Sequence, residues 1–195
     1  MSGEEQLHDR ERLEAIVREA GRNALAGWPG DGHALDHWEK SPGNPVCSVD
    51  LEVDGFLKRE LRALLPAAGW LSEETVDAPA RVNDSLVWLV DPVDGTRDFI
   101  GESSGWAGAV ALVQTRRPLL GYLYAPARRR EEGGEFWFGE AGKGSWRNGQ
   151  RLSASRRGLL PGARVPAQRL APEDADLELV DQPNSIALRM AMVAA

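Results

Sequence analysis

Two aspartates and a glycine stand together at the end of an apolar segment, in the stretch "LVDPVDGTRDF" at residues 89–99. Asp91 and Asp94 are three residues apart, and Pro92 between them fixes its own φ and restricts the conformation of Asp91. Carboxylates that converge at a strand end repel one another unless a cation lies between them, and ligand sets made only of oxygen suit Mg²⁺. The stretch therefore predicts a magnesium site. The alternative is a β-turn in which these residues do only turn chemistry.

Other residues with suitable chemistry lie close to this stretch in the expected fold. Glu73 follows the short apolar segment "GWLS", so it converges with Asp91 if the two strands are neighbours. Asp50 stands at the start of a predicted helix, where the alternative role is a favourable interaction with the helix dipole. Gly95 and Thr96 offer backbone N–H groups at a helix start, which suits a phosphate. Together these groups predict metal-assisted hydrolysis of a phosphate ester.

The spacing of the aspartates argues against another class of phosphatase. Haloacid-dehalogenase-type phosphatases use Asp-x-Asp-Gly-Thr after an apolar strand, and the first aspartate is the nucleophile. In this chain the position two before Asp94 is Pro92, which cannot attack phosphorus. The extra residue between the two aspartates therefore argues against that family.

Two helices and a short strand are expected ahead of the motif. Apolar residues recur at helical spacing within residues 4–27 and again from Val53 to Leu65, and Pro66 ends the second helix. Residues 28–48 are rich in Gly, Pro and Asp and predict a loop or a mobile segment. The segment "GWLSEE" predicts a short strand that ends in two acids.

The second half of the chain predicts mainly strands. The segments "SLVWLV", "WAGAVALV", "LLGYLY" and "EFWF" are short and either apolar or alternating, and "EAGKGSWRNGQ" predicts a turn and a hairpin with Asn-Gly at its tip. Residues 156–183 show too little periodicity for placement. The last stretch, "NSIALRMAMVAA", predicts a helix capped by Asn184 or Ser185.

Composition narrows the classes of partner. The net charge of −7 disfavours a nucleic acid polymer, whereas a small phosphate ligand is compatible with it if bound cations reverse the local field. No apolar run approaches roughly 18 residues, so we expect no membrane partner, and the charged N-terminus predicts no secretory signal. The single cysteine, Cys47, is compatible with a reducing compartment, and we expect a cytoplasmic protein. The run Arg128–Arg130 predicts a solvated turn, with a phosphate site as the alternative.

The pair "SEE" and "DPVDGTRDF" resembles the motifs of the inositol monophosphatase superfamily of Mg²⁺-dependent, lithium-sensitive phosphatases. The segment "WEKSPGNPVCSVDLEVDGFLKREL" is similar to that family's stretch in which a Lys and a Pro-Val precede Thr-Glu-Ala-Asp and a helix. The resemblance covers residues 5–155 well and 184–195 loosely. It implies an α+β fold, the layered αβαβα sandwich of the inositol monophosphatase/fructose-1,6-bisphosphatase type with its second half incomplete. Residues 1–155 would form an N-terminal α+β metal- and phosphate-binding subdomain, and residues 156–195 the start of a C-terminal α/β subdomain.

The resemblance also implies a role for each metal-binding residue. Glu73 matches an acid that ligates the first metal and takes part in catalysis, and Asp91 matches the aspartate that bridges two metals. The carbonyl of Val93 matches a backbone ligand, and Asp94 matches a ligand of the second metal. The implied cofactor is Mg²⁺, as two or three ions, with inhibition by lithium.

Three residues match the family's phosphate and water positions. Gly95 and Thr96 match the cradle that binds phosphate. Asp50 and Thr96 resemble the catalytic pair that orients the attacking water, with Asp50 near a third metal.

Within the superfamily, the chain is most similar to the 3'(2'),5'-bisphosphate nucleotidases. The charged pair Arg97-Asp98 follows Gly-Thr, and "PLLGYLYAPA" and "GEFWFGEAGKGSWRNGQRL" resemble the nucleotidase strand and hairpin. The implied reaction is hydrolysis of 3'-phosphoadenosine 5'-phosphate to AMP by metal-activated water. An inositol monophosphatase is the alternative. The implied partner is a small phosphorylated metabolite, and a homodimer is the assembly that the resemblance suggests.

The sequence departs from the family pattern at two points. Cys47 replaces the usual Thr, which we expect to change one local hydrogen bond. The family continues after its last matched helix into a strand and a Trp-Asp motif whose Asp is a metal ligand, but none of the seven tryptophans here is followed by Asp. We therefore expect a C-terminally truncated chain. A further hypothesis, of another class, is a non-catalytic remnant that binds metal or phosphate, or a module that binds a partner.

Overall fold

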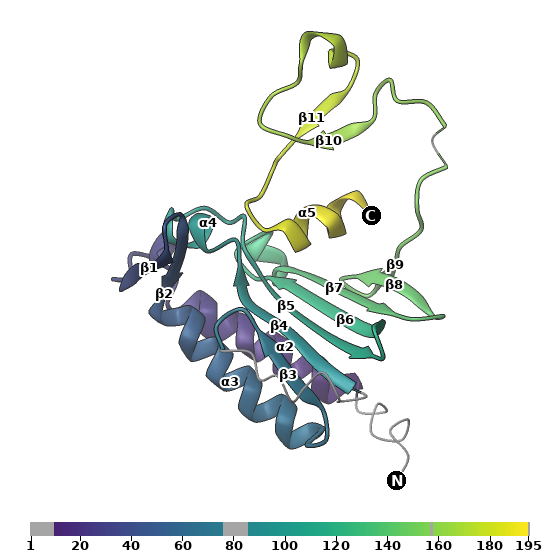
Figure 1. Cartoon of the computed structure of the whole chain (residues 1–195). Helices are drawn as coiled ribbons and strands as arrows, with labels where there is room; N and C mark the ends of the chain where they lie inside the picture. The colour runs from purple at the N-terminus through teal and green to yellow at the C-terminus, as the bar shows by residue number, and fades with distance from the viewer. Residues whose placement is uncertain (1–9, 76–85, 157, 195) are drawn as a thin grey trace.

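A seven-stranded mixed sheet forms the centre of the computed structural model, which describes residues 10–75, 86–156 and 158–194 (Figure 1). Strands β3 and β4 are parallel, and every other neighbouring pair in this sheet is antiparallel. The strands follow chain order across the sheet: β3 (Gly69–Ser72), β4 (Leu86–Asp94), β5 (Ala107–Gln114), β6 (Arg117–Ala125), β7 (Glu135–Glu140), β8 (Gly144–Arg147) and β9 (Gln150–Arg151).

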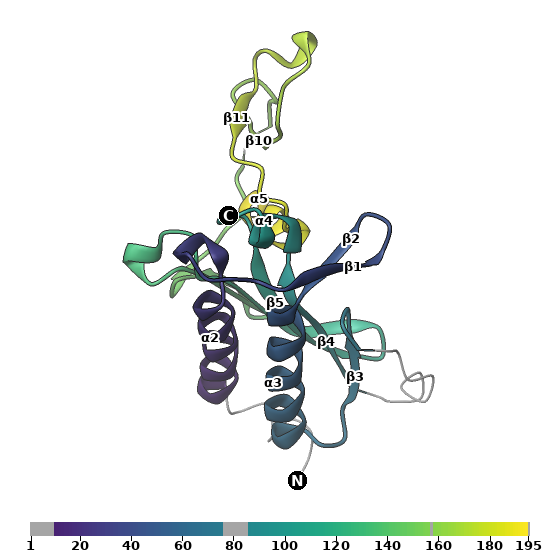
Figure 2. The same ribbon diagram turned by 90° about the vertical axis from the view of Figure 1, so that its left-hand side faces the viewer.

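Two long helices, α2 (Arg10–Ala26) and α3 (Ser48–Leu64), lie side by side on one face of the sheet (Figure 2). Both helices turn an apolar stripe inward, and the side chains buried between helices and sheet include Leu13, Leu57 and Trp88. Fully burying a leucine side chain contributes about 1.5–3 kcal/mol, so this layer supplies much of the stability. The two predicted helices are confirmed within the described residues, although positions 4–9 of the first lie outside them.

The predicted loop at residues 28–48 is only partly correct. A short 3₁₀ helix, η1 (Pro29–Asp31), is followed by a β-hairpin of β1 (His37–Ser41) and β2 (Asn44–Cys47). Every residue of β1 is exposed, and β2 buries two consecutive residues, Val46 and Cys47, so neither strand has the alternating pattern that reveals a half-buried strand in the sequence.

The other predicted strands are confirmed, and so is the Asn-Gly hairpin. Asn148 and Gly149, both with positive φ, form the tip between β8 and β9. Between the strands lie a short helix, α4 (Thr96–Ile100), and a 3₁₀ helix, η3 (Arg130–Glu132).

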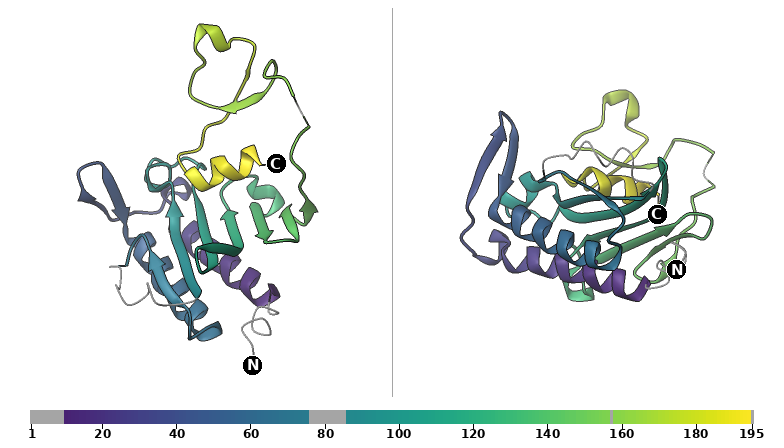
Figure 3. Two further views of the ribbon diagram at one scale, coloured as in Figure 1. Left: turned by 45° about the vertical axis from the view of Figure 1, so that its right-hand side comes forward. Right: turned by 60° about the horizontal axis from the view of Figure 1, so that its bottom comes forward.

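The segment after β9 leaves the sheet and returns to it (Figure 3). It carries a pair of parallel strands, β10 (Arg164–Pro166) and β11 (Glu178–Val180), and a 3₁₀ helix, η4 (Pro172–Asp174). Helix α5 (Ile186–Val193) then packs on the face of the sheet opposite α2 and α3, where the buried Leu188 lies in one cluster with Leu123 and Trp137. Ser185 is its N-cap, as predicted, and the division at residue 155 stays a prediction.

The α+β class predicted from the sequence is confirmed. Helices α2 and α3, the mixed sheet and helix α5 form successive layers. Among the described helices, none is both long enough and apolar enough to cross a bilayer.

Candidate active site

Strand β4 carries both aspartates of the "DPVDGT" motif. Asp91 pairs with Ala109 and Asp94 with Ala107, and the register shifts between these two pairs. The prediction that the acids follow the strand was therefore wrong in detail, because the strand continues through Asp94 with an irregularity of the kind that re-aims side chains.

Parallel pairing brings Glu73 beside Asp91. Ser72 pairs with Val90 at the end of β3, and the amide of Glu73 donates to the carbonyl of Val90 at 3.2 Å. The predicted convergence of the two acids is therefore a feature of the structure, and a hydrogen bond joins their side chains.

The environment of Asp91 strongly favours its neutral form. Burial raises the pKa of Asp91 to about 9, with further contributions from the charges of Glu73 and Asp94, the hydrogen bond with Glu73 and the charge of Asp50. An excess of carboxylates around a buried acid is the electrostatic setting that a bound cation relieves.

Asp50 lies at the first turn of α3 and is 1% exposed. Its Oδ2 accepts hydrogen bonds from the amide of Cys47 at 2.8 Å and from the Cys47 thiol at 2.7 Å. Its Oδ1 lies 3.3 Å from the Thr96 hydroxyl, so the structure brings the predicted water-orienting pair together. Burial raises the pKa of Asp50, and the hydrogen bonds from Cys47 and Thr96 oppose that shift.

Cys47 takes over the local role of the threonine that the family resemblance leads one to expect. Its thiol donates to Asp50, so the predicted change is one of donor type and not the loss of the hydrogen bond. Burial raises the pKa of the Cys47 thiol to about 12, and the hydrogen bond and charge of Asp50 contribute. The thiol is therefore a poor nucleophile here.

Lys40 is a site residue that the sequence did not single out. It lies on β1 of the hairpin, and its ammonium is 2.6 Å from Glu74 Oε1 and 3.6 Å from Glu73 Oε1. Burial lowers the pKa of Lys40, but the hydrogen bond and charge of Glu74 outweigh it and the net shift is upward. The only sequence signal was its place in the segment that resembles the family.

Asp94 faces the start of α5. Its carboxylate accepts hydrogen bonds from the Ser185 hydroxyl at 2.6 Å and from the amide of Ala187 at 2.7 Å. Gly95 lies under this contact with φ +92°, and a Cβ there would come within 2.7 Å of the Ser185 amide nitrogen. Gly95 is therefore required both for the backbone turn and for the close approach of α5.

The remaining predicted ligand and the two residues of the predicted phosphate cradle lie at the same turn. The carbonyl of the buried Val93 is 3.1 Å from the Thr96 hydroxyl. Gly95 is the N-cap of α4, and Thr96 is the first residue of that helix.

The donor set fits a hard divalent cation in its chemistry. In the described part of the chain, no three His, Cys, Asp or Glu side chains are already gathered closely enough to ligate one ion. Glu73 and Asp91 are in contact, Asp94 is directed to α5, and all three offer oxygen. The like charges that raise the pKa of Asp91 are the observation that favours a cation here.

A cavity of about 620 Å³ opens beside these acids on the face of the sheet that carries α5. Glu73 and Asp91 line it together with apolar residues of β5 and β6, and Trp137 and Trp146 line it on β7 and β8. The alanines of α5 form a further part of its wall. The acids are thus accessible from a hollow large enough for a small metabolite.

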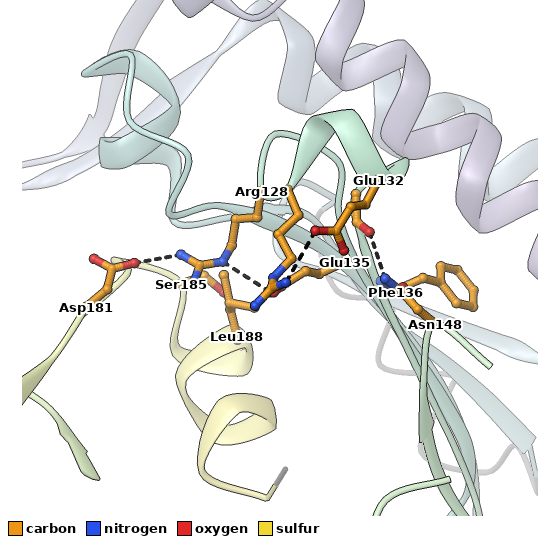
Figure 4. A network of polar contacts seen from close by, with 10 residues as sticks. Arg128, Glu132, Glu135, Phe136, Asn148, Asp181, Ser185 and Leu188 are labelled. Carbon is orange, nitrogen blue, oxygen red and sulfur yellow. Dashed lines mark hydrogen bonds and ion pairs between the residues drawn. The ribbon is translucent and has the colours of Figure 1, made fainter. Parts of the chain in front are cut away.

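The three arginines at 128–130 form ion pairs with acids other than those of the site, and Figure 4 shows Arg128 between Asp181 and Glu135. Arg128 forms ion pairs with Glu135 at 3.2 Å and Asp181 at 2.6 Å, and Arg129 pairs with Glu135 at 3.0 Å. Arg130 pairs with Asp31 at 2.5 Å. Arg128 therefore joins the β6–β7 turn to the segment that leads into α5, and Arg130 joins it to η1, so the prediction of a simple solvated turn was incomplete.

Comparison with known proteins gives a consistent result. The family model described as "Inositol monophosphatase family" matches residues 8–191. The 3'(2'),5'-bisphosphate nucleotidase CysQ of Salmonella typhimurium is 33% identical over 119 residues, which are 60% of this chain and 47% of that relative. The chain thus spans about half the length of this relative.

Solved structures show the same fold. The extragenic suppressor protein suhB from Bartonella henselae superposes with a TM-score of 0.79 at 24% identity, over 95% of this chain and 74% of that one. An IMPase/NADP phosphatase, solved with Mg²⁺ and phosphate, superposes with a TM-score of 0.59 at 20% identity, over 67% of this chain and 48% of that one.

Proposed function

The chain belongs to the inositol monophosphatase family, and we propose that it carries the metal-binding part of a Mg²⁺-dependent phosphomonoesterase site. The contact between Glu73 and Asp91 at the ends of two parallel strands carries this proposal. Two carboxylates held in contact repel each other and destabilise the fold. A cation bound between them, or a proton on one of them, removes that repulsion.

The residues that would hold the metal are the two acids in contact, Glu73 and Asp91, together with Asp94 and the carbonyl of Val93. A bound divalent ion would neutralise developing charge and lower the pKa of a water molecule. We propose two or three such ions and inhibition by lithium. The Mg²⁺ in the solved IMPase/NADP phosphatase supports the choice of metal.

Asp50 and Thr96 would orient the attacking water. The Thr96 hydroxyl is fixed between Asp50 and the Val93 carbonyl, at 3.3 and 3.1 Å, so its oxygen lone pairs are free to accept a hydrogen bond from water. Asp50 is the proton acceptor of this pair, because burial raises its pKa and makes it a stronger base than an exposed aspartate. The N–H groups of Gly95 and Thr96 would bind the phosphate.

We propose 3'-phosphoadenosine 5'-phosphate as the substrate and AMP as the product, supported by the identity to the nucleotidase CysQ. Inositol phosphate hydrolysis is the second candidate, favoured by the fold shared with the IMPase/NADP phosphatase. The partner is thus a small phosphorylated metabolite, and a homodimer is the assembly we propose.

The test is release of phosphate by the purified chain from a panel of esters, with Mg²⁺ and with a chelator. The panel holds 3'-phosphoadenosine 5'-phosphate, inositol 1-phosphate and NADP. We expect Mg²⁺-dependent release that is greatest with the first ester and absent in Asp91→Asn. The matched control is Asp174→Asn, at an exposed aspartate of η4. A chain that neither binds Mg²⁺ nor releases phosphate would refute the proposal, whereas a chain that binds Mg²⁺ but releases no phosphate from any ester would favour the non-catalytic remnant.

A further inference from the structure

Helix α3 carries a second buried aspartate that the proposed chemistry does not use. Asp54 lies one helical turn after Asp50 and is 6% exposed. Its Oδ1 accepts a hydrogen bond from the Ser72 hydroxyl, and its Oδ2 accepts one from the Thr75 hydroxyl at 2.6 Å. A buried carboxylate is costly unless it is well hydrogen-bonded, and these two donors provide that.

The two hydroxyls stand on either side of the acidic pair Glu73-Glu74. The Ser72 oxygen that donates to Asp54 also accepts from the amide of Glu74 at 3.2 Å. On the other side, the amide of Glu73 donates to Val90 of β4 at 3.2 Å. The turn that presents the Glu73 carboxylate is therefore fixed from two directions, by β4 and by α3.

Helix α3 thus contacts both acidic loops through its own carboxylates. Asp50 contacts Thr96 in the turn after β4, and Asp54 contacts Ser72 and Thr75 in the turn after β3. Because the two aspartates are four positions apart on one helix, the helix sets the distance between the loops.

We propose that Asp54 is a positioning residue that holds the Glu73 carboxylate in register with Asp91. The proposal rests on the proposed function, in which Glu73 ligates a metal. Loss of Asp54 would leave the hydroxyls of Ser72 and Thr75 without their charged acceptor and would release the turn. Outer groups that orient metal ligands typically change metal affinity by about 10–100-fold when they are removed.

The variants separate positioning from simple structural support. Asp54→Ala removes both acceptors. Asp54→Asn keeps one acceptor oxygen, and its NH₂ group can donate to the second hydroxyl oxygen, so it should restore part of the function. Thr75→Val removes a single hydroxyl at nearly constant shape. Glu52→Ala is the matched control, because Glu52 is an exposed acid on the same helix.

Two readouts are measured on the full chain. Calorimetry gives the affinity for Mg²⁺, and hydrogen exchange followed by NMR gives the protection of the Glu74 amide in the metal-free chain. For Asp54→Ala we expect Mg²⁺ affinity at least tenfold weaker and faster exchange at Glu74. Asp54→Asn and Thr75→Val should fall between Asp54→Ala and the wild type, and Glu52→Ala should match the wild type.

The outcomes distinguish this proposal from the proposed function. Absence of Mg²⁺ binding by the wild-type chain would overturn the proposed function, and exchange at Glu74 would then decide alone whether Asp54 orders the turn. Wild-type affinity and wild-type exchange in Asp54→Ala would overturn the positioning role. If Asp54→Ala fails to fold, Thr75→Val and Asp54→Asn decide, and unchanged values in both would overturn it as well.

Discussion

Replacing Asp91 by asparagine should stabilise the metal-free chain at neutral pH and remove its response to Mg²⁺. Burial, and then the charges of Glu73 and Asp94, raise the pKa of Asp91 from 3.8 to about 9. The folded chain therefore holds this group neutral at pH 7, whereas the unfolded chain ionises it. Since the folded pKa is the higher one, the contribution to stability is complete below pH 3.8 and is lost as the pH rises towards about 9.

The size of the effect follows from the same shift. Each pH unit above the ordinary value of 3.8 removes about 1.4 kcal/mol from the free energy of unfolding until the folded pKa is reached. At pH 7 the loss is about 4 kcal/mol. Asparagine has nearly the shape of the neutral acid and cannot ionise, so Asp91→Asn should avoid this loss.

Urea unfolding at several pH values between 4 and 9, in a chelator and in Mg²⁺, measures both parts of the prediction. The stability advantage of Asp91→Asn should grow with pH in the chelator. Mg²⁺ at a hundredfold excess over its Kd should add about 2.7 kcal/mol to the stability of the wild type and should leave that of Asp91→Asn unchanged. Asp174→Asn should follow the wild type in both conditions, with no stability advantage in the chelator and the same gain from Mg²⁺. Parallel curves for Asp91→Asn and the wild type at every pH would refute the reasoning.

Three further predictions concern the surroundings of the site. Ser185→Ala removes the N-cap of α5 and a donor to Asp94, so urea unfolding should show a loss of about 1 kcal/mol; an unchanged midpoint would contradict the capping role. Glu135→Gln replaces the buried carboxylate partner of Arg128 by a neutral amide and should lower the free energy of unfolding in urea by about 3 kcal/mol. An unchanged free energy of unfolding would mean that the ion pair with Asp181 alone compensates the charge of Arg128. Cys47, whose pKa is raised to about 12, should not react with iodoacetamide at pH 8 until the chain unfolds. Rapid alkylation of the native protein, detected by mass spectrometry, would contradict this.

The core of the candidate site could be predicted because its signals are local. Apolar segments run directly into Glu73 and into Asp91, so each acid had to lie near the end of a strand. The one assumption needed was that these two strands are neighbours, and the structure pairs them, in parallel. Thr96 and Asp50 were paired only through the family resemblance, since nothing in either local pattern connects residues 46 positions apart.

The contacts that could not be predicted join residues far apart in exposed or irregular segments. Lys40 lies on a hairpin strand that is exposed throughout, so its sequence shows no periodicity. The contact of Asp94 with Ser185 spans 91 positions and depends on the path of residues 156–183, which have no periodic pattern. The pairing of Arg128 with Asp181 depends on the same path. A run of arginines next to glutamates in the sequence does not indicate with which distant acid each arginine will form an ion pair.

The second aspartate of α3 had a sequence signal that went unused. Asp50 and Asp54 occupy the helical row that Leu57 and Leu61 continue, and all four are buried. An acid that heads an apolar row cannot be explained by helix dipole or solvation alone, because folding carries it out of water. Such an acid needs hydrogen-bond donors. When the donors lie on other elements, the hydrogen bonds fix those elements relative to the helix. Asp54 can therefore be selected from the sequence before any partner is known, and α3 is the element that joins the two acidic turns.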